Sequence, residues 1–135
     1  MTTMIFPNLP VKDLDAAKKF YTALGYKVNQ QFTDDNASAI VVSDAIVIML
    51  MREEFFNTFD SRTIADTSTT VESLHALGVD SREDVDRLIA DAGAAGGSIV
   101  KRPEAQGPMY GGSFKDLDGH HWEVMHMDPS AVEPY

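Results

Sequence analysis

The chain of 135 residues contains no cysteine, which excludes a disulfide framework, a thiolate nucleophile and thiolate metal ligands. Any metal would have to be held by His, Asp or Glu. Long apolar runs are lacking as well, because the longest, AIVIMLM at residues 45–51, is far too short to cross a bilayer. The first residues also lack the basic and apolar segments of a secretory signal. We therefore expect a cytoplasmic protein with no membrane partner.

Positive charge is scarce, since 11 Lys and Arg residues stand against 21 Asp and Glu residues and the formal net charge is -10. Such a balance repels the phosphates of nucleic acids, so we expect no nucleic-acid partner. The sequence also has no GxGxxG, P-loop, nucleophile-elbow or HExxH motif, and therefore gives no support to a hydrolase or nucleotide-transfer function. Its 44% hydrophobic and 24% charged residues are typical of an ordinary globular domain.

The chain contains an internal repeat. Residues 6–25 and residues 74–93 match at a constant offset of 68 positions, and apolar residues fall on apolar residues. The matched pairs are Val11 with Val79, Ala17 with Val85, Phe20 with Leu88, and Tyr21 with Ile89. The spacing of these residues predicts two amphipathic helices, near 13–24 and 82–95. Asp13 and Ser81 are the expected N-caps, and glycines at Gly25 and within 93–97 are the expected stops.

Segments with strand character follow each predicted helix. They are residues 26–32, 37–43 and 45–51 in the first half, and residues 97–102, 109–116 and 120–127 in the second. With a strand before each helix, the chain reads as a single domain made of two βαβββ modules, at about 1–59 and 70–128. The predicted fold class is α+β: two tandem, pseudosymmetric modules forming a curved mixed sheet around a central cavity, with the helices outside. The segment between them, 52–69, is expected to form a short helix and a strip across the cavity mouth.

Two stretches carry a resemblance to a known family. VKDLDAAKKFYTALGY at residues 11–26 and FKDLDGHHWEV at residues 114–124 resemble the two signature regions of the vicinal oxygen chelate superfamily. This superfamily contains glyoxalase I, extradiol dioxygenases, and the bleomycin- and fosfomycin-resistance proteins. The resemblance covers nearly the whole chain and implies the fold, whereas it leaves the activity open because one scaffold supports many chemistries.

The resemblance implies four ligand positions in members that use a metal. They correspond here to Phe6, Met49, Leu74 and Glu123, of which only Glu123 can bind a cation. We therefore predict a metal-free cavity and no cofactor. The alternative is a strand register shifted by one residue, which would bring His75 and His121 beside Glu123 as ligands of Zn, Ni, Fe or Mn.

The cavity expected from this alignment has a polar centre and an apolar lining. Glu123 is the candidate acid or base, with Tyr110 and His121 as its hydrogen-bonding partners. Arg52 is a candidate partner for an anionic group, and the glycine-rich residues 107–114 are expected to form a mobile loop over the ligand. The remaining candidate ligand-binding residues are Phe6, Asn8, Met49, Met51, Leu74, Met109 and Met125.

Three functions are consistent with the sequence. The first is a protein that binds a small organic molecule in a metal-free cavity, with or without catalysis. The second is a metal-dependent lyase or dioxygenase similar to glyoxalase I. The third is a drug-sequestering protein similar to the bleomycin-resistance proteins, for which the resemblance implies a homodimer and the net charge of -10 suits a cationic drug.

Overall fold

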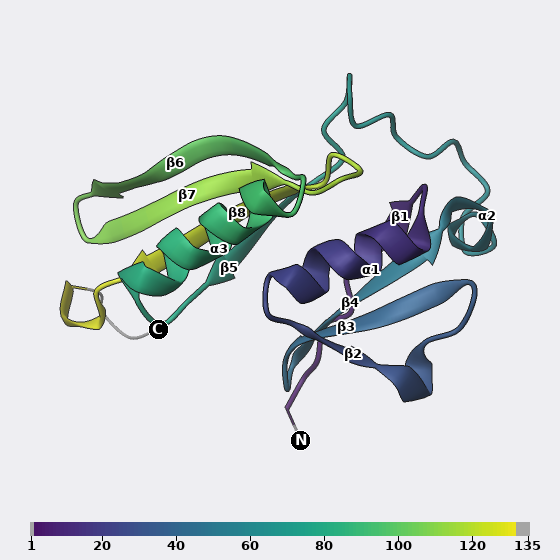
Figure 1. The fold of residues 1–135 in the computed structure, drawn as a ribbon, viewed down its shortest axis with the longest axis horizontal. Coiled ribbons are helices and arrows are strands. Elements are labelled where there is room, and N and C mark those ends of the chain that lie inside the picture. The colour runs from purple at the N-terminus through teal and green to yellow at the C-terminus, as the bar shows by residue number, and fades with distance from the viewer. Residues whose placement is uncertain (1, 132–135) are drawn as a thin grey trace. The chain divides into compact units, whose positions relative to one another are not determined.

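The computed structural model describes residues 2–131. The chain divides into two compact units, Met1–Thr70 and Val71–Tyr135, called the first and second unit below. Each unit contains one βαβββ module, as the sequence predicts, and Figure 1 shows each long helix lying against the sheet of its own unit. Among the helices formed by residues 2–131, none is long and apolar enough to cross a membrane.

The first unit has a four-stranded mixed sheet in the order β1-β4-β3-β2. Its β1 and β4 run parallel, and the other two pairings are antiparallel. A short 3-10 helix at Gln30–Phe32 follows β2, so only part of the predicted strand at 26–32 is extended. The elements are β1 (Asn8–Val11), α1 (Leu14–Ala23), β2 (Lys27–Asn29), β3 (Ala37–Ser43), β4 (Ile46–Arg52) and α2 (Glu53–Phe56).

The second unit repeats this topology in the order β5-β8-β7-β6. β5 runs parallel to β8, and β8 and β6 both run antiparallel to β7. The predicted mobile loop at 107–114 is wrong, because all but its first two residues belong to β7 and pair on both sides. The elements are β5 (Leu74–Gly78), α3 (Arg82–Ala94), β6 (Ser98–Gln106), β7 (Met109–Lys115) and β8 (His121–Met127), followed by a 3-10 turn at Pro129–Ala131.

The two long helices begin at equivalent positions and end differently. Asp13 accepts a hydrogen bond from the Ala16 backbone N–H at 3.0 Å, and Ser81 accepts one from Asp84 at 3.1 Å, which confirms both N-caps. Gly25, with φ of 98°, ends α1 in the left-handed region. In α3 this role falls to Gly96, with φ of 100°, because the helix continues through Gly93.

Residues that match in the repeat form the cores of both units. Phe20 and Tyr21, on the buried face of α1, are 2% and 1% exposed, and Leu88 and Ile89, which match them on the buried face of α3, are each 2% exposed. Burial of such side chains contributes about 1.5–3 kcal/mol each. Each helix therefore covers one face of its sheet. Side chains that contact a ligand are expected on the opposite face.

Candidate functional site

Side chains on β8 alternate between a buried face and a partly exposed one. Trp122 and Val124 are 2% and 0% exposed on the side of α3, as the sequence predicts. His121, Glu123 and Met125 point to the opposite side of the sheet and are partly exposed. We call this side, turned away from α3, the Glu123 face. It carries most of the candidate residues that fall in the second unit.

A direct contact joins two of the candidate catalytic residues. The Nε2 atom of His121 lies against Oε2 of Glu123, and the two side chains are 17% and 38% exposed. Residues two apart on a strand share a face, so the local backbone brings the imidazole to the carboxylate without any long-range contact. The contact holds one oxygen of Glu123 and leaves the other available as an acceptor.

The neighbours of Glu123 across the sheet are small. Ala76 lies beside it on β5, and Ser113 lies opposite it on β7. Ser113 is only 2% exposed. Sequence reasoning missed this residue. The turn at residues 116–120 could have revealed it, because a hairpin centred on Asp118 places position 113 opposite position 123.

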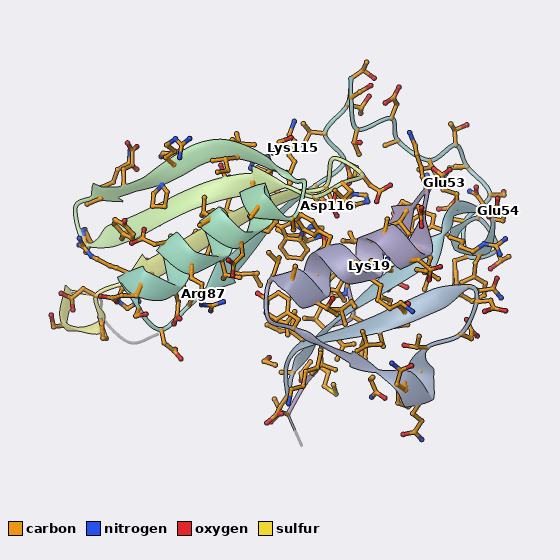
Figure 2. All side chains as sticks on the ribbon, in the orientation of Figure 1. Lys19, Glu53, Glu54, Arg87, Lys115 and Asp116 are labelled. Atoms are coloured by element: carbon orange, nitrogen blue, oxygen red, sulfur yellow. The ribbon has the colours of Figure 1, made fainter. Side chains whose placement is uncertain are left out.

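A small pocket opens on the Glu123 face. Its volume is about 90 Å³. Lys101 and Glu104 form an ion pair of 3.0 Å at its edge, so their charges largely offset each other. Lys115, at the end of β7 (Figure 2), lies beside His121 in the strand register. The residues lining the pocket are Lys101, Glu104, Gln106, Met109, Gly111, Gly112, Glu123, Val124 and Met125.

His75 does not belong to this face. It lies beside Trp122 in the pairing of β5 with β8, and the two rings contact each other with centroids 4.9 Å apart and planes tilted by 34°. Burial lowers the pKa of His75, and the nearby His120 lowers it further. The Nδ1 atom of His75 is buried and has no hydrogen-bond partner in the described part of the chain. The shifted register that would bring His75 beside Glu123 is therefore not the one observed.

Tyr110 also lies on the other side of the sheet. It is paired with His126, its hydroxyl donates to Oδ1 of Asp86 at 2.6 Å, and the Arg82 guanidinium lies 4.9 Å from its ring centroid. The hydrogen bond to Asp86 raises the pKa of Tyr110. The structure brings His121 to Glu123 and does not bring Tyr110 there.

Leu74, the remaining candidate of the second unit, lies at the end of the Glu123 face. It is 63% exposed and pairs with His121, whereas Ala76 is the residue beside Glu123. In the first unit, Phe6 precedes β1 and is 49% exposed, and it accepts a hydrogen bond of 2.5 Å from Nδ2 of Asn8 through its carbonyl oxygen. Asn8 in turn lies beside Met49. Met51 is buried, at 4% exposure.

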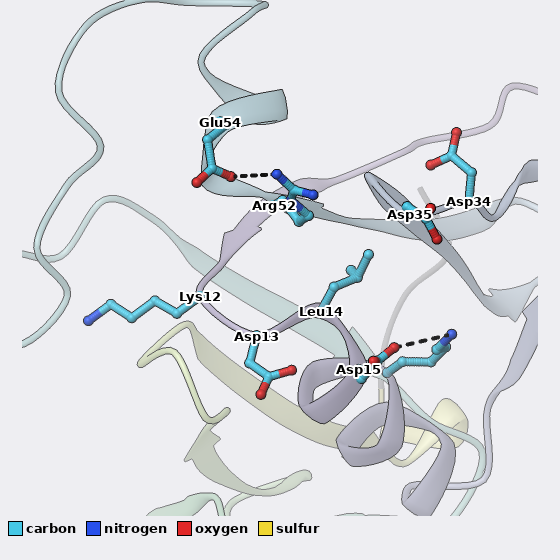
Figure 3. A pocket seen from close by; sticks show the side chains of 9 residues that line it. Lys12, Asp13, Leu14, Asp15, Asp34, Asp35, Arg52 and Glu54 are labelled. Atoms are coloured by element: carbon cyan, nitrogen blue, oxygen red, sulfur yellow. Dashed lines mark hydrogen bonds and ion pairs between the residues drawn. The ribbon is translucent and has the colours of Figure 1, made fainter.

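Arg52 contributes to a second, larger pocket, which lies within the first unit (Figure 3). Its volume is about 450 Å³. Four of its lining residues form two local ion pairs, Arg52 with Glu54 at 3.3 Å and Lys18 with Asp15 at 3.9 Å. The guanidinium is thus matched by a carboxylate of this chain, which weakens the case for Arg52 as the anchor of an anionic ligand. The pocket is lined by Lys12, Asp13, Leu14, Asp15, Lys18, Asp34, Asp35, Arg52 and Glu54.

The donor set on the Glu123 face does not fit a divalent transition metal. It offers one carboxylate and one imidazole, which already contact each other, and Leu74 and Ala76 on the neighbouring strand have no donor side chain. Among residues 2–131, no group of three His, Asp or Glu side chains could hold a metal ion.

Comparisons with known proteins give a consistent result. Residues 3–124 match the family model of the Glyoxalase/Bleomycin resistance protein/Dioxygenase superfamily. Hypothetical protein SA1046 from S. aureus is 31% identical, with 93% of this chain and 94% of that chain covered and a TM-score of 0.79. None of the curated proteins compared with the chain matches it.

Two further solved structures share the fold at lower identity. A glyoxalase/bleomycin resistance protein/dioxygenase family enzyme from Burkholderia phytofirmans PsJN is 19% identical over 94% of this chain and 100% of that one, with a TM-score of 0.78. TioX from Micromonospora sp. ML1 is 18% identical over 94% and 100% of the two chains, with a TM-score of 0.64. At these identities the likeness concerns the fold alone.

Proposed function

Because the chain belongs to the glyoxalase/bleomycin resistance protein/dioxygenase superfamily, we propose that it binds a small organic molecule on the Glu123 face, without a metal. In this proposal Glu123 accepts a hydrogen bond or a proton from the ligand, and His121 holds the carboxylate in place. The superfamily supplies the scaffold, and the side chains of this face define the ligand.

One observation carries the proposal: a carboxylate that is 38% exposed, fixed by an imidazole, at the edge of a pocket. A surface glutamate used only for solubility needs no such neighbour, because water already solvates it. Here the contact with His121 lowers the number of orientations that the carboxylate samples, which reduces the entropy lost when a ligand binds. A site prepared in this way is typical of recognition or of proton transfer.

Glu123 and His121 together support hydrogen bonding and proton transfer. A carboxylate accepts hydrogen bonds from N–H, O–H or ammonium groups, and it can remove a proton from a bound acid when the geometry is suitable. The imidazole keeps its other nitrogen for a second contact. Binding is the function proposed, and proton abstraction by Glu123 is the reaction that this arrangement would support.

The test is a thermal-shift screen of a broad library of small organic molecules. A bound ligand stabilises the folded state by RT ln(1 + [L]/Kd), about 2.7 kcal/mol at a hundredfold excess over Kd. We expect hits that carry a donor or cationic group, and we expect Glu123→Gln to lose them while keeping its own melting temperature.

The matched control is Glu83→Gln, which removes the same charge from the exposed first turn of α3. It should bind every hit as the native protein does. If Glu123→Gln also kept full affinity for the cationic hits, Glu123 would not be their partner and the proposed function would be wrong.

A further inference from the structure

We propose that the pocket on the Glu123 face binds a short amino acid, or a zwitterion of similar size, whose ammonium group contacts Glu123 and whose carboxylate contacts Lys101. The inference rests on the proposed function and names the class of its ligand. Both residues line the pocket of about 90 Å³, and they come from β8 and β6, the strands on either side of β7. The pocket thus has an anionic group on one wall and a cationic group on the other.

An irregularity in the pairing of β6 with β7 brings Lys101 to this face. Ile99 pairs with Phe114, which is 1% exposed on the side of α3. In a regular strand Lys101, two residues further on, would point to that same side. The register shifts between Ile99 and Lys101, however, and Lys101 pairs with Ser113, which lies opposite Glu123. Bulges of this kind change the direction of a side chain and are frequent next to active sites.

A second shift places the ion-pair partner of Lys101 on the same face. Glu104 is three residues after Lys101, so regular alternation would put the two side chains on opposite sides of the sheet. The register shifts again between them, and Glu104 lines the same pocket. Its Oε1 atom lies 3.0 Å from Nζ of Lys101. Glu104 thus holds the ammonium at one wall as His121 holds Glu123 at the other, which reduces the entropy lost when a ligand binds.

The ion pair leaves Lys101 able to contact a ligand. An ammonium has three N–H donors, and the contact with Glu104 uses only one of them. Both side chains are half-exposed, so the pair itself contributes little free energy, and a ligand carboxylate can share Lys101 with Glu104 or replace it. The charged residues of the lining are Lys101, Glu104 and Glu123, one cation against two carboxylates. A simple anion is therefore repelled, whereas a zwitterion satisfies both walls.

The strand register also limits the length of the ligand. Lys101 and Glu123 both pair with Ser113, so their Cα atoms are two strand spacings apart, about 9.5 Å. Side chains stand roughly perpendicular to a sheet, and two charge-assisted hydrogen bonds of about 2.8 Å each then leave about 4 Å between the nitrogen and the oxygen of the ligand. A short amino acid has this separation. The pocket volume of about 90 Å³ agrees, since it is smaller than the engineered cavity of about 150 Å³ known to enclose benzene.

The experiment compares three probes with the same carbon chain. β-Alanine carries both charges, propylamine carries the ammonium alone, and propanoate carries the carboxylate alone. Their binding to the full chain is measured from chemical-shift changes during an NMR titration, which detects millimolar affinities. We expect the native protein to bind β-alanine about fivefold more tightly than propylamine, because Lys101 adds a hydrogen bond between charged groups. We expect propanoate to bind most weakly of the three.

Three variants assign the two contacts. Lys101→Met keeps most of the side chain and removes its charge, so it should bind β-alanine about fivefold more weakly than the native protein does and bind propylamine with native affinity. The matched control is Lys27→Met, which makes the same change at an exposed position of β2 and should bind every probe as the native protein does. Glu123→Gln should lose both β-alanine and propylamine, since they share the ammonium group.

The outcomes are distinguishable. Equal affinity of the native protein for β-alanine and propylamine would overturn the zwitterion site while leaving Glu123 as an anchor, and this comparison needs no variant. Native affinity of a folded Lys101→Met variant for β-alanine, or no binding of β-alanine to the native protein at tens of millimolar, would overturn the site as well. Native affinity of Glu123→Gln for both ammonium probes would overturn the proposed function itself.

Discussion

Glu123 occupies in the second unit the position that Met49 occupies in the first. Met49 lies beside Asn8 in the parallel pair β1–β4, and Glu123 lies beside Ala76 in the parallel pair β5–β8. Asn8 and Ala76 are themselves separated by the repeat offset of 68. The two units therefore share a register at this position and differ in its chemistry.

Because of this difference, the two units offer different chemical groups to a ligand at equivalent positions. One unit presents a carboxylate held by an imidazole, and the equivalent residue of the other unit is an apolar thioether. A thioether is a soft ligand that does not replace a carboxylate for Zn, Ni, Fe or Mn in a site of hard donors. The asymmetry favours recognition of an organic ligand over coordination of an ion.

The first prediction concerns metal content. We expect the purified protein to carry well under one equivalent of Zn, Ni, Fe or Mn, because one carboxylate and one imidazole bind such ions weakly. Elemental analysis after dialysis without chelator, followed by titration with each ion, is the measurement. One tightly held equivalent that is lost in both Glu123→Ala and His121→Ala would contradict the prediction and identify these two residues as ligands.

The second prediction concerns His121. We expect His121→Phe to weaken ligand binding by about three- to tenfold, less than Glu123→Gln does, because the carboxylate remains but is no longer held. Calorimetric titration of any hit from the library screen measures the two variants side by side. A loss in His121→Phe larger than that in Glu123→Gln would show that the imidazole, and not the carboxylate, is the main contact.

The third prediction concerns the helix caps. Asp13→Ala and Ser81→Ala each remove a side chain that accepts from a backbone N–H at about the same position of α1 and α3. Each should lower the free energy of unfolding by about 1 kcal/mol. Urea unfolding followed by circular dichroism measures both, and Asp15→Ala, which removes a carboxylate paired with Lys18 at 3.9 Å, is the control. A change of similar size in the control would show that charge and not capping is responsible.

The sequence was sufficient to predict the architecture because the repeat constrains it twice. The helix starts, their caps and the burial of residues such as Phe20 and Leu88 all agree with the structure. The apolar face of each helix must be covered by a sheet. Few topologies are compatible with a unit of one strand, one helix and three further strands that is repeated at a constant offset. The error at 107–114 arose from glycine content, which also suits strands packed closely against a neighbour.

The site was less predictable because it depends on pairing between strands. The contact of His121 with Glu123 follows from alternation along one strand, which a sequence reveals. The placement of Tyr110 on the side of α3 depends on the pairing of β7 with β8, and so do the positions of Gly111 and Ser113. Cross-strand register is set by turns and packing, and an error of one residue moves every side chain to the other face.

The last prediction concerns pH and His75. Burial, then repulsion from His120, lowers the pKa of this imidazole, whereas Glu72 and Asp116 act in the opposite direction. The ordinary pKa of a histidine is about 6.5. Just below that pH, His75 of the unfolded chain takes up a proton, whereas His75 of the native protein does not. The native state then binds fewer protons than the unfolded state, so stability falls as the pH falls from about 6.5 to the lowered native pKa.

Replacement of the ring by a non-titrating one isolates this contribution. His75→Phe keeps an aromatic ring against Trp122 and removes the proton-binding site, while the charges of His120, Glu72 and Asp116 stay in place. We expect the native protein to lose more stability than His75→Phe between about pH 7.5 and pH 5.5. Urea unfolding, followed through the fluorescence of Trp122, the only tryptophan of the chain, measures both. Parallel pH profiles would show that His75 titrates alike in the folded and unfolded states.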